Sequence, residues 1–272
     1  TVEVKSGYGL TPADELKMLR AIKACGSRQP IECVATYLAA HTVPPEFDGD
    51  PDGYLDAIVA YDLLERIKNE GLAEFADAFC ERTAFDVPRS RRFLEACARF
   101  RMTPRLHADQ ITQMGASRLA AEVGARSADH LETIDDAGIA AMKAAGTIAV
   151  LLPACSFYLG VPQAPARRII DAGLPVAVAT DFNPGSCVVE SLPLTLSIAC
   201  TQMRMTPEQV LVAATSNAAA VLNRSERIGA LEVGMDADLV VLDVPNLEQM
   251  CYFAGRNCTR AVVKRGAVVW EG

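Results

Sequence analysis

The chain has 272 residues, half of which are hydrophobic, and a formal net charge of −8. This length can bury a large core, either as one α/β barrel or as two ordinary domains. Because acidic and basic residues are interspersed, the charge argues against a nucleic-acid partner and against an anionic membrane partner.

Nine cysteines are scattered along the chain without the spacing of a disulfide framework or a zinc knot. An odd count without Cys-x-x-Cys pairs is typical of reduced, mostly buried thiols. No apolar run is long enough to cross a bilayer, and no basic-then-apolar leader is present. We therefore expect a cytoplasmic protein.

Strand-like and helix-like segments alternate along most of the chain. The predicted strands cover residues 2–5, 31–38, 75–80, 104–108, 126–131, 147–152 and 176–181. Helices are predicted from Thr11-Pro12, over 55–67, 89–100 and 119–123, from Thr133, and over 166–172, 192–200, 207–214 and 217–222. Such alternation with short connections predicts parallel βα units and an α/β fold.

Repeated βα units of this size fit a (β/α)8 TIM-type barrel. The chain begins directly with a strand-like stretch at Thr1, so we expect the first βα unit to be absent. A doubly wound open sheet is the alternative, although no glycine-rich first turn of that fold is present. From Gly229 the pattern changes to short strands at 237–243, 260–264 and 267–270. We predict a barrel over residues 1–222 and a small β-sandwich segment over 223–272.

All three histidines of the chain follow predicted strands. His41, His107 and His130 lie at the carboxyl ends of three strands, and Asp181 lies at the tip of a fourth. A single histidine is more often a hydrogen-bonded core residue. The set nevertheless favours one common site, because strand ends converge at one mouth of a barrel. Imidazole and carboxylate groups bind zinc or a similar ion while leaving a position open for water.

Water bound to such an ion ionises near neutral pH, and a nearby carboxylate or histidine can carry its proton to a leaving nitrogen. Hydrolysis of a carbon–nitrogen bond is therefore the predicted reaction class. Two or three ligands make an incomplete shell, so we expect further ligands on the missing first strand. Cys80 beside Glu81 suggests a thiol nucleophile, but apolar surroundings favour an inert buried cysteine. Lys5 is open between a solvated strand end and a site cation.

Six segments carry a more specific signal. They are Val4–Leu10, Ala40–Glu46, Leu106–Gln110, Ser127–Leu131, Ala149–Pro153 and Ala179–Gly185. Together they resemble the imidazolonepropionases, a family within the metal-dependent amidohydrolase superfamily. The later segment Gly229–Leu242 is similar to the stretch with which many amidohydrolases leave the barrel and enter a small β-sandwich.

The resemblance implies hydrolytic opening of the imidazolone ring of imidazolonepropionate to formiminoglutamate, a step of histidine degradation, with one zinc or iron ion per chain. It implies that His107 and Asp181 bind the metal and that the catalytic residues are His130, Asp181 and Gln110. The implied substrate contacts are Tyr8, His41, Gln110, Asn183, Gly185 and Ser186. Gln110 stands where some members have Glu and cannot take a proton, so the role of base shifts to Asp181 or His130.

The His-x-His pair of the family, and an arginine expected to meet the propionate, have no counterpart in this sequence. We therefore expect the polypeptide by itself to bind metal weakly and to be poorly active. The alternatives are another cyclic amidohydrolase or deaminase on the same barrel, and an inactive fragment acting as a structural module. The resemblance also implies a homodimer, which no feature of the sequence itself indicates.

Overall fold

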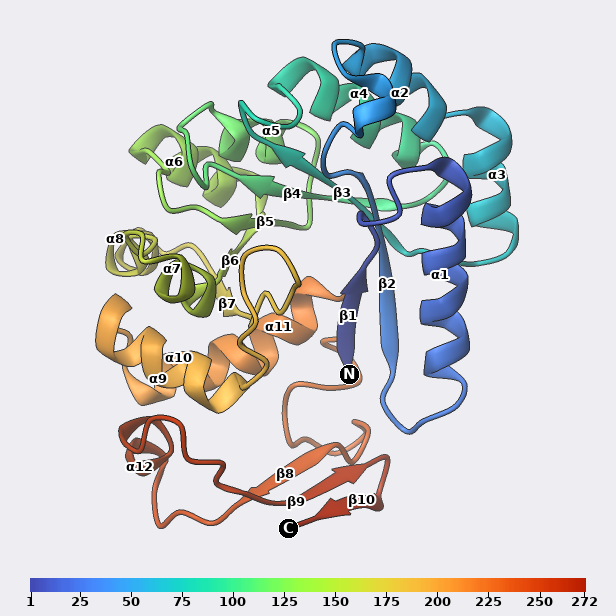
Figure 1. Ribbon diagram of the computed structural model, residues 1–272. Coiled ribbons are helices and arrows are strands. Elements are labelled where there is room, and N and C mark those ends of the chain that lie inside the picture. Colours follow the sequence, from blue (N-terminus) through green and yellow to red (C-terminus); the bar gives the residue numbers. More distant parts are fainter. The chain divides into compact units, whose positions relative to one another are not determined.

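The computed structural model describes all 272 residues, Thr1–Gly272. The chain divides into two compact units, Thr1–Thr147 and Ile148–Gly272 (Figure 1). Both units combine parallel strands with helices, so the predicted α/β class is confirmed. None of the helices combines the length and the apolar character that a membrane span requires.

The first unit is built on five parallel strands that follow one another in chain order. They are β1 (Val2–Lys5), β2 (Cys33–Ala40), β3 (Phe75–Cys80), β4 (Thr103–Ala108) and β5 (Ser127–His130). The pairing of β3 with β4 is regular over its whole length, from Phe75 opposite Thr103 to Cys80 opposite Ala108. Because the strands are parallel, their carboxyl ends lie at one edge of the sheet.

Five helices and a short 3-10 turn connect these strands, and a sixth helix, α6, follows β5. They are α1 (Pro12–Gly26), η1 (Pro45–Phe47), α2 (Pro51–Ile58), α3 (Tyr61–Asn69), α4 (Val87–Ala98), α5 (Ala116–Glu122) and α6 (Asp136–Ala145). The start of α1 is as predicted, because Thr11 accepts a hydrogen bond from the Asp14 N–H at 3.1 Å and Pro12 takes the first helical position. Its buried stripe is Leu16, Leu19 and Ile22.

Two of the predicted helices of this unit were wrong in detail. The single helix over 55–67 is two helices, because Ala60 adopts an extended conformation (φ −54°, ψ 136°) between α2 and α3. The apolar spacing continues across this break, which is why the pattern did not show it. Helix α6 is capped by Asp135, whose carboxylate accepts from the Gly138 N–H at 2.7 Å. The predicted cap, Thr133, instead donates its hydroxyl to the Asp109 carbonyl oxygen.

The second unit contains a parallel strand pair with helices and a separate antiparallel sheet. The pair is β6 (Ile148–Leu151) and β7 (Val176–Val178), and the helices are α7 (Pro153–Leu159), α8 (Ala166–Asp171), α9 (Leu192–Met203), α10 (Pro207–Ala214), α11 (Ser216–Val221) and α12 (Leu247–Tyr252). The antiparallel sheet is β8 (Leu239–Leu242), β9 (Thr259–Lys264) and β10 (Ala267–Glu271). The domain boundary near Asn223 and the β-sandwich stay predictions.

Sequence reasoning missed α7 and overestimated β7. Pro153 was interpreted as the end of a strand, but it occupies the first turn of α7, where its missing N–H costs nothing. Strand β7 covers only three residues, so Asp181 lies in the loop that follows it and not at its tip. The side-chain amide of Asn217 in α11 donates to the Val176 carbonyl oxygen at 2.7 Å and fixes α11 beside β7.

A buried ionic network covers one face of the five-stranded sheet. Lys5 lies within 3.2 Å of three carboxylates, those of Glu3, Asp77 and Asp129. The Arg105 guanidinium is 2.7 Å from Glu3 and 3.2 Å from Asp129. Glu3 and Lys5 occupy alternate positions of β1, and Asp77 lies opposite Arg105 in the register of β3 with β4, so their side chains point to one face. Three carboxylates therefore share two cations inside the first unit.

The network is charged in spite of its burial. Burial raises the pKa of an aspartate, but Arg105 and Lys5 outweigh it and lower the pKa of Asp129 to about 2. Burial also acts on Asp77, and there His107 and Lys5 hold the pKa well below its ordinary value. Removing one member would leave a buried charge without its partner, which costs roughly 3–5 kcal/mol.

We predict that the free energy of unfolding falls on acidification below about pH 4. An unfolded aspartate titrates near pH ~3.9, whereas Asp129 titrates at about 2 in the fold. Between these two pH values the unfolded chain binds more protons than the folded chain, so the free energy of unfolding rises with pH in this range. The contribution of Asp129 is fully present above about pH 4 and is lost towards pH 2, and it is on the order of 2 kcal/mol.

Urea unfolding followed by circular dichroism at a series of pH values measures this loss. The matched control is Asp129→Asn, which lacks the carboxylate and is therefore expected to be less stable at neutral pH and less sensitive to acid. A wild-type stability that stays constant between about pH 5 and pH 3 would contradict the prediction.

Candidate active site

The structure brings four of the predicted site residues together at the strand ends of the first unit. The Tyr8 ring lies 5.0 Å from the His41 ring, and the His107 ring lies 5.3 Å from the His130 ring, measured between centroids. Phe79 stands between the two pairs, 6.0 Å from His41 and 6.1 Å from His107. Tyr8, His41, Phe79, His107 and His130 thus form a row of rings along one edge of the sheet, called here the ring row.

A buried carboxylate holds the loop that carries Tyr8. Glu15 of α1 is completely buried and accepts backbone N–H groups of residues 7, 9 and 10 at 2.7–3.2 Å. Gly7 has a φ of +112°, and a Cβ at this position would lie 2.8 Å from the Leu38 carbonyl oxygen. Only glycine fits there. The loop and the helix that follows it therefore set the position of the Tyr8 ring.

His41 is tied to the same loop. Its Nδ1 lies 3.1 Å from the Gly7 carbonyl oxygen, and since a carbonyl only accepts, Nδ1 carries the proton. Burial lowers the pKa of His41, and the neighbouring His107 lowers it further. The imidazole is therefore neutral at neutral pH, with Nε2 left as an acceptor.

His107 is held by an aspartate that the sequence analysis missed. Asp77 of β3 accepts a hydrogen bond from the His107 backbone N–H at 3.1 Å and lies 3.0 Å from His107 Nδ1. The other carboxylate oxygen of Asp77 accepts from Lys5 at 2.6 Å. Lys5, whose role was open from the sequence, is thus a partly buried partner of the network and not a solvated strand end. The available signal was an acid inside the otherwise apolar strand Phe75–Cys80.

The donor set around His107 fits a metal ligand. With Nδ1 engaged by Asp77, the ring keeps Nε2 for an ion, the arrangement usual for metal-binding histidines. Ligand atoms of Asp77, His107 and Asp129 also lie within 4.8 Å of one another. That group is not a competing metal site, because the Lys5 ammonium group already contacts both carboxylates.

Gln110 lies in a loop that two further buried acids fix. Glu81 accepts the backbone N–H groups of Ile111 and Thr112 at 3.1 and 2.9 Å. Asp109 accepts three backbone N–H groups at the start of α5, at 3.0–3.2 Å. Neither acid was assigned a role from sequence. Gln110 is half-buried and lies in this hydrogen-bonded loop.

The end of β5 is strained. His130 and Leu131 both have left-handed backbone conformations, with φ of +81° and +71°. Such a conformation costs about 1–3 kcal/mol for a residue other than glycine and is found mainly at functional sites. His130 is almost fully buried, and its Nδ1 lies 3.6 Å from the Glu132 carboxylate. The position of this ring is therefore maintained against a local cost.

In the second unit, Asp181 begins a tight loop. Its backbone is left-handed, with a φ of +52°. The Asn183 side-chain oxygen accepts the Gly185 and Ser186 N–H groups at 2.9 and 2.7 Å, and its amide donates to the Asp181 carbonyl oxygen at 2.8 Å. The three predicted substrate contacts after Asp181 thus form one turn. Because Asp181 and His107 belong to different units, their sharing of one ion stays a prediction.

Cys155 of α7 is an unpredicted neighbour of this loop. Its Sγ lies 3.9 Å from the Ser186 hydroxyl oxygen. Burial raises the pKa of the Cys155 thiol, and the Asp181 carboxylate raises it further. The thiol is therefore protonated at neutral pH. Cys80 is completely buried, and burial raises the pKa of its thiol to about 11, as expected for a core thiol.

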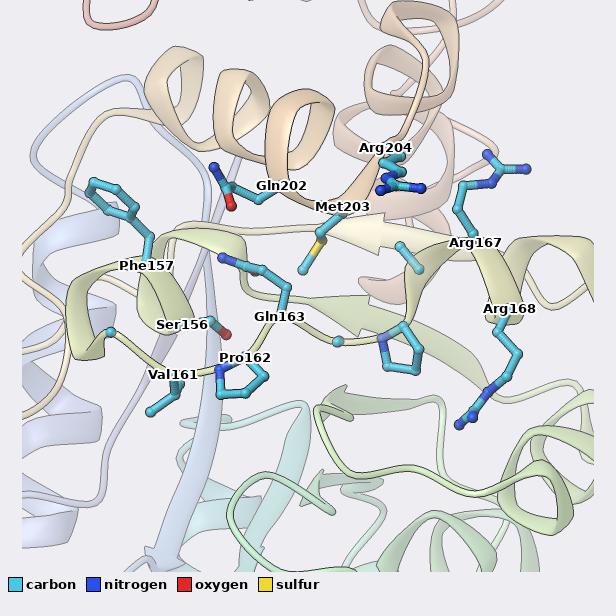
Figure 2. A pocket seen from close by; sticks show the side chains of 14 residues that line it. Ser156, Phe157, Val161, Pro162, Gln163, Arg167, Arg168, Gln202, Met203 and Arg204 are labelled. Atoms are coloured by element: carbon cyan, nitrogen blue, oxygen red, sulfur yellow. The ribbon is translucent and has the colours of Figure 1, made fainter.

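A cavity is present in each unit. A cavity of about 530 Å³ in the first unit is lined by the loops after β2 and β3. Its lining includes Arg82 and Thr42, the residue that follows His41 in the chain. A cavity of about 650 Å³ in the second unit lies between α7, α8 and the end of α9 (Figure 2). It contains none of the predicted site residues, and its Arg167 is already paired with Asp171. The lining of the first cavity contains no predicted site residue either, so neither cavity by itself marks the substrate site.

Solved structures with similar folds include two hydrolytic enzymes. A triazine hydrolase variant has a TM-score of 0.78 and 19% identity, over 99% of this chain and 67% of that one. An adenosine deaminase from Xanthomonas campestris with bound zinc has a TM-score of 0.70 and 19% identity, over 92% of this chain and 63% of that one. At this level of identity the likeness shows the fold alone.

Relatives found by sequence are more similar in sequence to this chain than these solved structures are. A protein of Rubrobacter xylanophilus named "Imidazolonepropionase" is 49% identical over 272 residues. The match covers the whole of this chain and 65% of that relative, so the chain spans less than two thirds of its length. Residues 99–269, more than half of the chain, match the sequence model of the amidohydrolase family. The chain therefore belongs to the amidohydrolase family.

Proposed function

We propose that the protein is an imidazolonepropionase, which opens the ring of imidazolonepropionate by hydrolysis to formiminoglutamate in histidine degradation. The identity of 49% to a relative of that name supports this proposal. The observation that carries it is the ring row, in which His107 keeps Nε2 for an ion and lies next to His130.

In this proposal His107 and Asp181 bind one zinc or iron ion, with further ligands from the His-x-His pair that the family resemblance implies. Such an ion, when bound, lowers the pKa of a coordinated water to near neutrality. The side chains of His107 and Asp181 suit such an ion, because a neutral imidazole and a carboxylate are common ligands of zinc and of iron.

The chain's own residues would bind the ring and move the proton. Tyr8 and His41 contact the substrate, and the Nε2 atom of His41 is an acceptor suited to an N–H of the imidazolone. Asp181 or His130 takes the proton of the attacking water and delivers it to the leaving nitrogen. Gln110 contributes a hydrogen bond only. The turn formed by Asn183, Gly185 and Ser186 contacts the substrate from the Asp181 side.

We also propose an architecture and a cellular compartment for the enzyme. Further chain would complete a (β/α)8 barrel, and β8–β10 would belong to a small β-sandwich. All nine cysteines are free, which supports a reducing compartment such as the cytoplasm. The homodimer that the resemblance implies stays a prediction.

The direct test is turnover by the protein expressed from its complete natural gene. Loaded with zinc or iron, it is expected to open an imidazolone that bears a carboxylate tail and to release formiminoglutamate, measured by the loss of ring absorbance and by mass spectrometry. The control substrates are an imidazolone without the tail, a cyclic amide and a purine nucleoside. Equal turnover of the tail-less ring, or turnover of another substrate alone, would reject the assignment.

Variants test the proposed roles separately. His107→Ala and Asp181→Asn each remove a proposed ligand, so bound metal, measured by elemental analysis, is expected to fall at least tenfold together with turnover. His130→Gln is the matched comparison, because it removes a proton carrier but no proposed ligand. It is expected to keep its metal and to lose about 10²- to 10⁴-fold in kcat. Full metal content in His107→Ala would contradict the ligand assignment.

A further inference from the structure

We infer that Asp77 and Lys5 are positioning residues for the metal, which fix both the orientation and the tautomer of His107. The inference rests on the proposed function, since it takes His107 as a metal ligand. It adds two residues that do not touch the ion or the substrate.

The carboxylate of Asp77 restrains His107 at two points. One oxygen accepts the His107 backbone N–H at 3.1 Å and faces Nδ1 of the same residue at 3.0 Å. Because an ionised carboxylate only accepts, the Nδ1 atom must carry the proton. The lone pair is then on Nε2, the one ring nitrogen left for an ion.

Lys5 fixes the aspartate in turn. Its ammonium group donates to the other oxygen of Asp77 at 2.6 Å, so both oxygens have assigned partners and the carboxylate plane cannot rotate. Asp77 is completely buried, so water cannot replace its hydrogen bond to Lys5 or its hydrogen bonds to His107. The hydrogen-bonded series Lys5–Asp77–His107 therefore connects the end of β1 to the ring row.

The charge of the network acts in the same direction. Glu3, Asp77 and Asp129 carry three negative charges, and Lys5 and Arg105 carry two positive charges. One negative charge is left over next to His107. In a buried setting this charge favours a cation bound to the ring.

The tautomer can be measured in the metal-free wild-type protein, expressed from its complete gene. Nitrogen-15 NMR of the imidazole side chains distinguishes the two neutral tautomers, and the His107 signals are those lost in His107→Ala. We expect the proton on Nδ1. A proton on Nε2 would overturn the inference, whatever the substrate of the enzyme is.

The substitution Asp77→Asn provides the second test. The introduced amide has one acceptor and one donor, while Lys5 and His107 both require an acceptor. If the amide oxygen turns to Lys5, the amide N–H₂ faces Nδ1 and drives the proton to Nε2. We expect zinc affinity, measured by competition with a chromogenic chelator, to fall about 10- to 100-fold.

The double variant Lys5→Met/Asp77→Asn separates positioning from folding. Without the ammonium group the amide oxygen can face both N–H groups of His107, so zinc affinity is expected to recover at least severalfold relative to Asp77→Asn. A purely structural role predicts the opposite, because the double variant loses more of the network. Absence of recovery, with both variants folded by circular dichroism, would count against the inference.

Asp129→Asn is the matched control. It makes the same change in the same buried network, next to Lys5 and Arg105. Because it removes one negative charge as Asp77→Asn does, it is expected to lose stability and part of the zinc affinity, but to lose several times less affinity than Asp77→Asn, since His107 keeps its tautomer. An equal loss of affinity in Asp129→Asn and Asp77→Asn would also overturn the inference. Since zinc affinity is measured without substrate, a failure of the proposed ring opening leaves these outcomes unaffected.

Discussion

The hydrogen-bonded carboxylate of Asp77 is the interaction on which the candidate site depends. It joins a lysine of the first strand to a histidine of the fourth, across the sheet of the first unit. A buried carboxylate is costly unless its oxygens are paired. Here the pairing that makes the charge tolerable also sets the ring that is proposed to bind the metal. Stability and chemistry in this unit therefore rest on the same contacts.

Buried acids serve a second purpose at the strand ends. Glu15, Glu81 and Asp109 each accept several backbone N–H groups from a loop that follows a strand. Such loops must cover an active site with polar backbone, and each buried N–H without a partner would cost free energy. One carboxylate satisfies two or three of them at once. The loops that present Tyr8 and Gln110 are in this way ordered before any ligand binds.

The sequence allowed prediction of the strand positions in the first unit, the start of α1 and the gathering of histidines at one edge. Periodicity and caps are local signals, and parallel strands bring their ends together whatever lies between them. Asp77 and Lys5 could not be predicted, because their partners are 30 and 72 residues away along the chain. The break at Ala60 was missed because an apolar stripe does not report where a helix ends, and α7 was missed because a proline after an apolar run is compatible with the end of a strand and with the first turn of a helix.

A crystal structure of the metal-loaded protein, with anomalous scattering recorded at the absorption edge of zinc or iron, tests the central claim most directly. The account predicts one metal peak per chain, bonded to Nε2 of His107 and to the carboxylate of Asp181, with Nδ1 of His107 still facing Asp77. A peak bonded to Nδ1, or one held by Asp77 and Asp129, would contradict it.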